Sequence, residues 1–452
     1  MNEARALTKV EVTGLLDRFH HEVPFPESDS FVIVHGPNGV GKTKLLELLS
    51  AVAWPIQLDT LLELPFGTLN LSFSDNTRLT VIKKTPKLDS DDQRRNRPRE
   101  LGITFTLTAQ NLETTKWSPA AKSPLDTDIS TWIDRDSRNL SAHERELRNT
   151  LAHHMAITRF WESQDPWHSE LPTNVRELLL DSAPDTLKKF LSGLRVHVID
   201  THRLLVQPRE EDRRRRRPAS TKVEEFSQDL SKRLSKELAE NSRTSQERDR
   251  TYPRRLLGTS LMHVASEQEI RDRYDDQEDL RRQLGDISLI DERSGVIEIP
   301  EHMEDWQRAV LWTYLEDTEE KLSTFKDVLA RVSLLRDIVN SRFLFKDLEI
   351  DRDHGFRLVS DDGQELDLAS LSSGEQHELV LVYDLLFNVN PGAIVLIDEP
   401  EISLHVSWQK RFMSDLRRIA DLVQFRTIVA THSPQIAGKW ADRMVRLGPS
   451  AE

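Results

Sequence analysis

Residues 36–43 form a glycine-rich segment, Gly-Pro-Asn-Gly-Val-Gly-Lys-Thr, which limits the possible folds of this chain more than any other stretch. It matches the pattern G-x-x-x-x-G-K-[ST]. A short β-branched run, Phe31–Val34, precedes it, and the apolar spacing of Lys44–Val52 predicts a buried helix after it. In that setting, consecutive backbone N–H groups curl around a phosphate at the positive end of a helix. The segment therefore predicts an α/β fold with a nucleotide-phosphate site; a glycine turn without a ligand is the weaker alternative.

The candidate nucleotide-binding residues of this segment are Gly36, Pro37, Asn38, Gly39, Val40, Gly41, Lys42 and Thr43. Lys42 is expected to neutralise the β- and γ-phosphates of ATP, which also makes it a catalytic candidate. The hydroxyl of Thr43 is a candidate ligand of Mg²⁺.

Two adjacent carboxylates follow a second apolar run, Ile394–Ile397. Such a run predicts a central parallel strand, and ligands of α/β sheets bind at the carboxyl ends of these strands. We expect Asp398 to hold Mg²⁺ through water and Glu399 to orient and polarise the attacking water. Taken alone, a strand followed by a surface Asp-Glu turn explains the pattern equally well.

A third motif, Leu371-Ser-Ser-Gly-Glu-Gln376, precedes an apolar helix at Leu379–Phe387. It resembles the signature sequence of ABC-type ATPases, with Ser373 where the commonest form has glycine. In that family the motif binds the γ-phosphate held by the other subunit, and its position at a helix start suits an anion. The resemblance implies four further nucleotide-binding residues: Ser372, Ser373, Gly374 and Glu375.

The fourth motif is an apolar run, Thr427–Thr431, that ends in His432. It resembles the switch histidine of ABC-type ATPases, which contacts the γ-phosphate, so His432 is a catalytic candidate. A lone histidine after a strand is more often structural. All four motifs nevertheless occur in the order and at the spacing typical of that family, which a chance combination does not explain.

The stretch from Thr43 to Leu371 is several times longer than in transporter ATPases. A long insertion between two halves of an ATPase head resembles the SMC, Rad50 and RecF group, and the overcoming-lysogenization-defect (OLD) type in particular. Glu401-Ile-Ser-Leu-His405 occupies the D-loop position, and His405 replaces the usual aspartate as in RecF- and OLD-like proteins. The resemblance implies that two chains face each other head to tail around two Mg·ATP molecules, as a homodimer or within a larger oligomer.

The patterns predict three regions. Residues 1–205 are expected to form the N-terminal half of the head, with an antiparallel lobe near 66–110, and 345–452 its C-terminal half. Residues 206–344 are expected to hold a charged linker and a helical insertion, either a projecting hairpin or coiled coil or an ordinary helical subdomain. The seam Val223–Leu238 suits internal packing better than a partner surface. Pro253 is expected to interrupt this helix, and two further helices are expected at about 266–284 and about 304–341.

The insertion and its neighbours leave several residues with two interpretations. The arginine run Arg213–Arg217 suits nucleic-acid phosphates, although adjacent acids favour a solvated loop. Gln110 and Gln207 are the candidates for the Q-loop glutamine, and no aromatic residue stands out for stacking adenine. His153-His154 lacks a recognisable third metal ligand.

Only residues 433–452 follow the switch histidine, too few for the Toprim nuclease domain of OLD proteins. The layout resembles the ATPase subunits of PARIS- and Septu-type anti-phage systems. It implies a separately encoded effector, a toxin or nuclease, whose release the ATPase controls on sensing infection. A DNA-repair ATPase of the RecF/Rad50 type is the alternative, and a transporter ATPase is disfavoured by the insertion.

The amino-acid composition limits the possible partners and the cellular location of the protein. The chain lacks cysteine, so thiolate metal sites and cysteine nucleophiles are excluded. With 62 Lys+Arg against 76 Asp+Glu the net charge is −14, which disfavours non-specific nucleic-acid binding but leaves a local nucleic-acid site possible. Without a membrane-length apolar run or a secretory leader, we expect a cytoplasmic protein with no membrane partner.

Overall fold

The computed structural model describes residues 5–26, 29–84, 99–100, 102–110, 112–121, 179–199, 221–258, 265–290 and 297–448. The chain divides into two units. The first comprises Met1–Thr201, Val389–Ile402 and Gln409–Glu452, and the second His202–Asn388 and Ser403–Trp408. The arginine run, Gln207 and the 153–154 histidine pair lie outside the described residues, and the domain limits at 205 and 344 remain a prediction.

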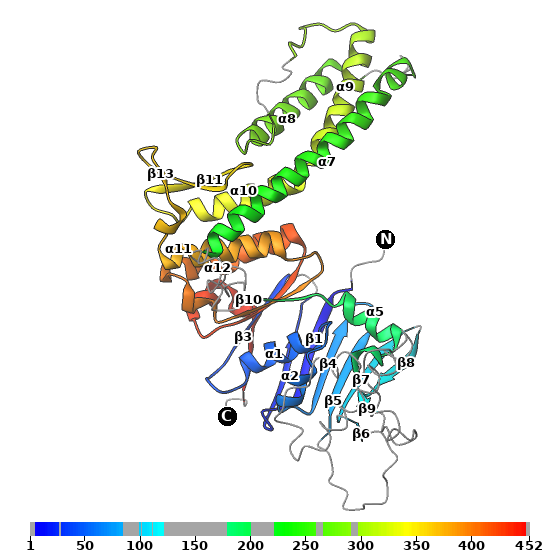
Figure 1. The fold of residues 1–452 in the computed structure, drawn as a ribbon, viewed down its shortest axis with the longest axis vertical. Coiled ribbons are helices and arrows are strands. Elements are labelled where there is room, and N and C mark those ends of the chain that lie inside the picture. Colours follow the sequence, from blue (N-terminus) through cyan, green and yellow to red (C-terminus); the bar gives the residue numbers. More distant parts are fainter. Residues whose placement is uncertain are drawn as a thin grey trace, which may run out of the picture. The chain divides into compact units, whose positions relative to one another are not determined.

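The first unit contains a six-stranded antiparallel sheet with the order β2-β1-β4-β5-β7-β8 (Figure 1). Its strands are β1 (Leu7–Leu15), β2 (Phe19–Pro24), β4 (Thr68–Phe73), β5 (Arg78–Lys83), β7 (Ile103–Ala109) and β8 (Leu112–Trp117). Alternate apolar side chains face one another across the sheet, as in the pairs Leu69↔Val81 and Leu71↔Leu79, and are buried. The predicted antiparallel lobe is therefore confirmed. It is larger than predicted, because β1, β2 and β8 extend the sheet beyond residues 66–110. A short pair, β6 (Arg99–Glu100) and β9 (Ala120–Ala121), lies apart from it.

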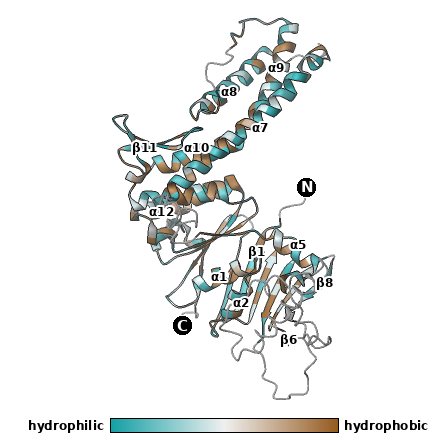
Figure 2. Ribbon diagram, in the orientation of Figure 1, coloured by the Kyte–Doolittle hydropathy of each residue, from teal (hydrophilic) through white to brown (hydrophobic). Residues whose placement is uncertain are grey.

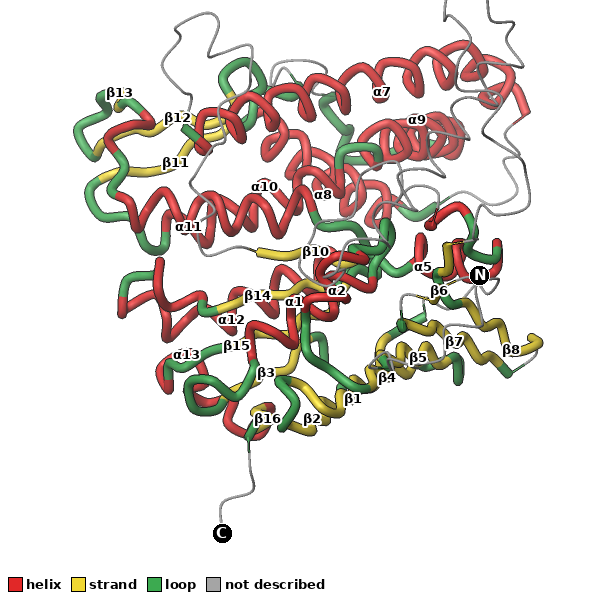
Figure 3. The backbone as a smooth tube through the Cα atoms, turned by 60° about the horizontal axis from the view of Figure 1, so that its bottom comes forward, coloured by secondary structure: helices red, strands yellow, loops and turns green. Residues whose placement is uncertain are grey.

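The second sheet of this unit is parallel, with the order β10-β14-β15-β3-β16 (Figure 3). Its strands are β10 (Val196–Ile199), β14 (Ile394–Asp398), β15 (Arg426–Ala430), β3 (Phe31–His35) and β16 (Met444–Arg446). The middle strands are apolar and buried, as expected when helices cover both faces. Asp398 pairs with Ala430 and Ala430 with Val34, so these three strands end level with one another.

Helices of the first unit are α1 (Lys42–Val52), α2 (Leu58–Glu63), α5 (Asp185–Gly193) and α13 (Pro434–Ala437), with 3-10 turns at Pro400–Ser403 and Gly438–Arg443. Most of α12 (Val406–Val423) also belongs to this unit. The mixed α/β fold class predicted from the sequence is confirmed. The pattern at 195–200 predicts a buried strand, and this detail was wrong: β10 is an edge strand with a single neighbour, and its Val198 is 48% exposed.

The second unit is mainly helical (Figure 1). Its elements are α7 (Lys222–Gly258), α8 (Glu267–Gly285), α9 (Asp305–Ser323), α10 (Lys326–Asn340), β11 (Lys346–Asp351), β12 (Gly355–Ser360), β13 (Glu365–Leu366), a 3-10 turn (Leu368–Ser370), α11 (Ser373–Tyr383) and a π-helical turn (Asp384–Asn388). Helix α9 packs against both α7 and α8, as in a helical subdomain. Figure 2 shows hydrophilic residues along much of α7 and α8, so each buries only a narrow stripe. Val223, Phe226, Leu230 and Leu234 are buried, which confirms the internal packing predicted for that seam.

Two helix predictions in this unit were wrong. Helix α7 continues through Pro253 to Gly258. Proline has no N–H, so the carbonyl of Asp249, four residues earlier, loses its helical partner. Because Asp249 is exposed, water can bind this carbonyl instead. The stretch expected to be one helix near 304–341 is two, α9 and α10. The carbonyl of Lys321 accepts hydrogen bonds from the Asn241 amide at 2.6 Å and from the Thr324 hydroxyl at 2.9 Å. This carbonyl therefore does not take part in the backbone hydrogen bonding of a continuous helix.

No helix within the described ranges combines the length with the apolar character that a bilayer span requires.

Candidate nucleotide-binding site

The glycine-rich turn connects β3 to α1, as its sequence predicted. Gly39 and Gly41 adopt left-handed φ angles of 83° and 91°, a region that side chains disfavour. A Cβ at Gly36 would lie 2.4 Å from the Leu447 carbonyl oxygen, so this glycine is also required by space. Helix α1 has neither a side-chain cap nor an acidic residue in its first turn. Its N-terminal N–H groups are therefore available to an external anion.

Lys42, the first residue of α1, is buried and folds back over this turn. Its Nζ donates to the carbonyls of Gly36 at 3.1 Å and Pro37 at 3.3 Å. Burial lowers the pKa of Lys42, while Glu399 and Asp398 oppose that shift. An incoming phosphate would supply the counter-charge that these two neutral carbonyls lack.

Asp398 ends β14 near Thr43, whose hydroxyl favours the ionised carboxylate and so opposes the rise of its pKa. Burial raises the pKa of Asp398 above its usual range, and neighbouring Glu399 adds to the effect. Its Oδ1 is buried and has no hydrogen-bond partner among the described residues. A buried oxygen acceptor next to a hydroxyl suits a hard cation such as Mg²⁺, which typically takes one or two protein ligands and completes its shell with phosphates and water. The residues present thus fit the predicted metal.

Glu399 follows Asp398 directly in the chain, and its side chain lies near that of His432. The φ angle of Glu399 is 43°, and its backbone N–H donates to the Ala430 carbonyl at 2.8 Å, which ties the end of β14 to the end of β15. The Nε2 of His432 is 3.7 Å from Oε1 of Glu399, and each side chain is 33% exposed. A strained, non-glycine backbone of this kind persists only where the surroundings fix it, and such residues concentrate at active sites.

Glu401 is the residue of this site that the sequence reasoning missed. Its Oε1 accepts from the backbone N–H groups of His432 at 2.6 Å and Ser433 at 3.1 Å, and its Oε2 accepts from the Thr431 hydroxyl at 2.9 Å. The side chain of Ser433 also donates to Gln409 on α12 at 2.9 Å. Glu401 therefore fixes the loop that carries His432. The sequence feature that could have indicated this role is a third carboxylate two positions after the Asp-Glu pair.

The signature motif lies in the second unit, at the N-terminus of α11 as predicted. Ser372 is the N-cap, and its hydroxyl and backbone N–H both bond to Glu375 Oε2 at 2.8 Å. Burial would raise the pKa of Glu375, but these bonds and the Lys346 ammonium at 3.0 Å hold it below its usual value. Gly374 faces Trp408, whose ring would lie 3.7 Å from an added Cβ. Ser372 and Ser373 are both exposed, although the Ser372 N–H and hydroxyl are engaged by Glu375.

Gln110, one of the two Q-loop candidates, accepts from the Asn76 amide at 3.2 Å beside the hairpin ends of the antiparallel sheet. Nothing in this contact assigns it a nucleotide role.

Comparison with known proteins places the chain in a family. Residues 31–437 match the family described as "AAA domain, putative AbiEii toxin, Type IV TA system". The "Retron Ec83 probable ATPase" of Escherichia coli is 32% identical over 135 residues, which are 27% of this chain and 24% of that protein. The "Retron Vc95 probable ATPase" of Vibrio cholerae serotype O1 biovar El Tor is 35% identical over 89 residues, 17% of either chain. The chain thus spans a quarter or less of these curated relatives.

Among solved structures, the Smc head domain of Pyrococcus furiosus, with an extended coiled coil and bound to the C-terminal domain of ScpA, aligns over 98% of this chain and 93% of its own. The TM-score is 0.34 and the identity 12%, too low to support an argument. The family match instead spans nearly the whole chain and includes all four motifs. This chain therefore belongs to that AAA-domain family.

Proposed function

We propose that this protein is an ATP-hydrolysing subunit of a bacterial anti-phage defence system, which senses infection and controls a separately encoded toxin or nuclease. The catalytic part is supported chiefly by the buried, unpartnered Oδ1 of Asp398 beside Thr43, with Glu399 and His432 adjacent. The defence part is supported by the family description and by the two retron relatives.

The proposed division of labour follows from position and charge. Lys42 and the N-terminus of α1 bind the β- and γ-phosphates, while Thr43 and Asp398 hold Mg²⁺. The bound Mg²⁺ would neutralise charge that develops on the phosphate oxygens. Glu399 orients the attacking water and accepts its proton, and His432 contacts the γ-phosphate. The signature residues of a second copy, led by Ser372, complete the γ-phosphate site.

The dimer is tested with the Glu399→Gln variant, which should bind ATP without hydrolysing it. Light scattering with Mg·ATP should then give twice the monomer mass of 52.2 kDa. The same variant carrying Ser372→Ala should stay monomeric, because the second copy loses its γ-phosphate contact. A Glu399→Gln protein that remains monomeric with ATP would rule out the nucleotide sandwich.

A mixing experiment tests the composite site itself. Lys42→Ala and Ser372→Ala proteins should each be inactive, yet their mixture should regain hydrolysis. A mixed dimer pairs the intact glycine-rich turn of one chain with the intact signature of the other. A mixture as inactive as its components would contradict the shared site.

The defence role predicts co-purification with the product of a neighbouring gene. A DNA-repair ATPase of the RecF/Rad50 type is the rival, and it should bind DNA with a steep salt dependence and be stimulated by it. DNA-stimulated hydrolysis together with the absence of any co-purifying effector would favour the rival.

A further inference from the structure

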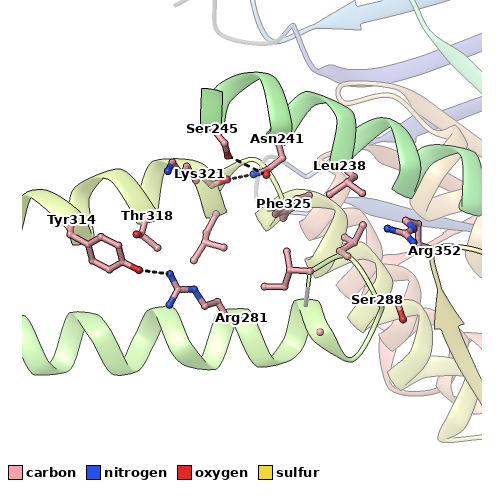
Figure 4. Close-up of a pocket in the computed structure, with 14 residues that line it drawn as sticks. Leu238, Asn241, Ser245, Arg281, Ser288, Tyr314, Thr318, Lys321, Phe325 and Arg352 are labelled. Carbon is pink, nitrogen blue, oxygen red and sulfur yellow. Dashed lines mark hydrogen bonds between the residues drawn. The ribbon is translucent and has the colours of Figure 1, made fainter. Parts of the chain in front are cut away.

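The second unit contains a cavity of about 830 Å³ between α7, α8 and α9 (Figure 4). A cavity of this size holds a ligand as large as a nucleotide. It lies in a different unit from the glycine-rich turn, and none of the predicted nucleotide-binding residues lines it.

Three cationic side chains line this cavity: Arg281, Lys321 and Arg352. Neither an aspartate nor a glutamate is among its lining residues in the described part of the chain. Figure 4 shows Arg281 reaching from α8 across to Tyr314 on α9, where its Nη2 donates to the phenol oxygen at 3.2 Å. The walls therefore present positive charge to whatever occupies the space.

Each cation is held by a carboxylate outside the cavity. Arg281 pairs with Glu278, Lys321 with Asp249 at 2.6 Å, and Arg352 with Asp353 at 3.0 Å. These ion pairs hold the cationic side chains in place but use only some of their hydrogen-bond donors, because an arginine has five N–H groups and a lysine has three. Burial opposes the charge of Arg281, yet the hydrogen bonds to Tyr314 and Glu278 raise its pKa further, so it stays charged at any physiological pH.

Several backbone acceptors near the cavity already accept hydrogen bonds. The carbonyls at the end of α8, those of Arg282, Leu284 and Gly285, each accept a backbone N–H from the turn that follows. The Lys321 carbonyl accepts from Asn241 and Thr324. An acceptor-rich anion would find donors on three walls of the cavity.

The remaining lining is mixed, and its apolar side chains include Leu238, Leu289 and Leu322. A fully hydrated inorganic ion would gain little from these side chains. The combination of cations, hydroxyls such as Thr318 and an apolar wall suits an organic molecule that carries a phosphate.

We propose that this cavity binds a phosphate-bearing organic molecule of nucleotide size, separately from the ATP site. Because its ligand would contact α7, α8 and α9 together, binding should stabilise the insertion as a whole. The inference does not depend on the proposed defence function.

Calorimetric titration of the full chain with AMP tests this proposal, since AMP lacks the β- and γ-phosphates that the glycine-rich turn is expected to hold. The titration is repeated in the Lys42→Ala variant to exclude that turn. We expect one AMP site with a Kd below about 1 mM in both proteins. Affinity should fall about tenfold or more in Arg281→Gln. It should be unchanged in Arg282→Gln, the next residue of α8, whose side chain is 70% exposed.

Inorganic phosphate and ribose 5-phosphate separate the possible sources of affinity. AMP should bind most tightly; equal binding of inorganic phosphate would overturn the nucleotide-size assignment. Absence of heat with all three probes, or equal AMP affinity in Arg281→Gln, would overturn the site. If Arg281→Gln does not fold, hydrogen exchange of the unaltered chain decides: AMP should protect α8 and α9, and protection confined to the glycine-rich turn would refute the proposal.

Discussion

Glu401 offers the sharpest test of the hydrolytic site, because its carboxylate holds the loop that carries His432. Replacing it with alanine removes the acceptor of two backbone N–H groups, those of His432 at 2.6 Å and Ser433 at 3.1 Å. Hydrogen bonds to a charged acceptor contribute about 1.5–3 kcal/mol each. This loop is partly exposed, so water replaces the lost partner, and we expect the free energy of unfolding to fall by only about 1–2 kcal/mol.

The effect on hydrolysis should be larger than that on ATP binding. Without Glu401 the loop no longer holds His432 beside Glu399, and a displacement of about 1 Å at a reacting group costs up to about 10²-fold in rate. We expect kcat to fall about 10- to 100-fold, which corresponds to about 1.4–2.7 kcal/mol in activation free energy. The Kd for ATP should stay within about twofold, since Lys42 and the N-terminus of α1 are untouched.

The assay is phosphate release at saturating ATP, measured well below the unfolding temperature, with ATP binding measured separately. Glu401→Gln keeps one acceptor oxygen but loses the charge, so its kcat should lie between those of Glu401→Ala and the unaltered protein. Glu47→Ala is the matched control, because within the described part of the chain this carboxylate bonds to Lys44, on the surface of α1.

A double-mutant cycle decides between positioning and an independent role. If Glu401 acts through His432, the double variant Glu401→Ala/His432→Ala should be no slower than His432→Ala alone. Additive losses, or a Glu401→Ala protein with unchanged kcat, would refute the reasoning.

Three further predictions concern single contacts. Lys42→Ala should lower phosphate release by about 10²-fold or more, and Lys44→Ala should not. Arg342 and Glu378 form an ion pair whose side chains are each 2% exposed. Arg342→Met should lower the free energy of unfolding, measured in urea, by about 3–5 kcal/mol, and adding Glu378→Leu should restore most of that stability. Burial and a carboxylate partner raise the pKa of Tyr383 well above its usual value, so its share of stability is present below pH ~10 and is lost as the pH rises further. Tyr383→Phe should therefore be less stable by about 1–2 kcal/mol at pH 7, and this difference should shrink in urea titrations above pH ~10.

The parts of the molecule that the sequence predicted are those set by local pattern. The run Phe31–Val34 and the glycine turn determine β3 and the start of α1 whatever surrounds them. The apolar run before Asp398 likewise determines a buried parallel strand. The alternation at residues 69–73 and 79–81 predicts two paired strands.

The features that sequence reasoning missed depend on contacts between distant segments. The break after Ser323 follows from Asn241, which lies 80 positions away from the carbonyl that it binds. The role of Glu401 depends on a loop 31 positions further along the chain. No periodicity within either segment records such a partner, because side-chain patterns report which face is buried and not which backbone group is bound.

The register of the parallel sheet explains why the half-buried Glu401 matters for hydrolysis. Asp398, Ala430 and Val34 are aligned across neighbouring strands, so backbone pairing alone brings the acidic pair and the glycine turn to one edge. His432 lies two residues beyond that alignment, where no ladder hydrogen bond holds it. Strand pairing therefore determines the position of the phosphate- and metal-binding groups, whereas the histidine depends on the Glu401 carboxylate. Substitutions in the strands should impair binding and hydrolysis together, and those at Glu401 should impair hydrolysis alone.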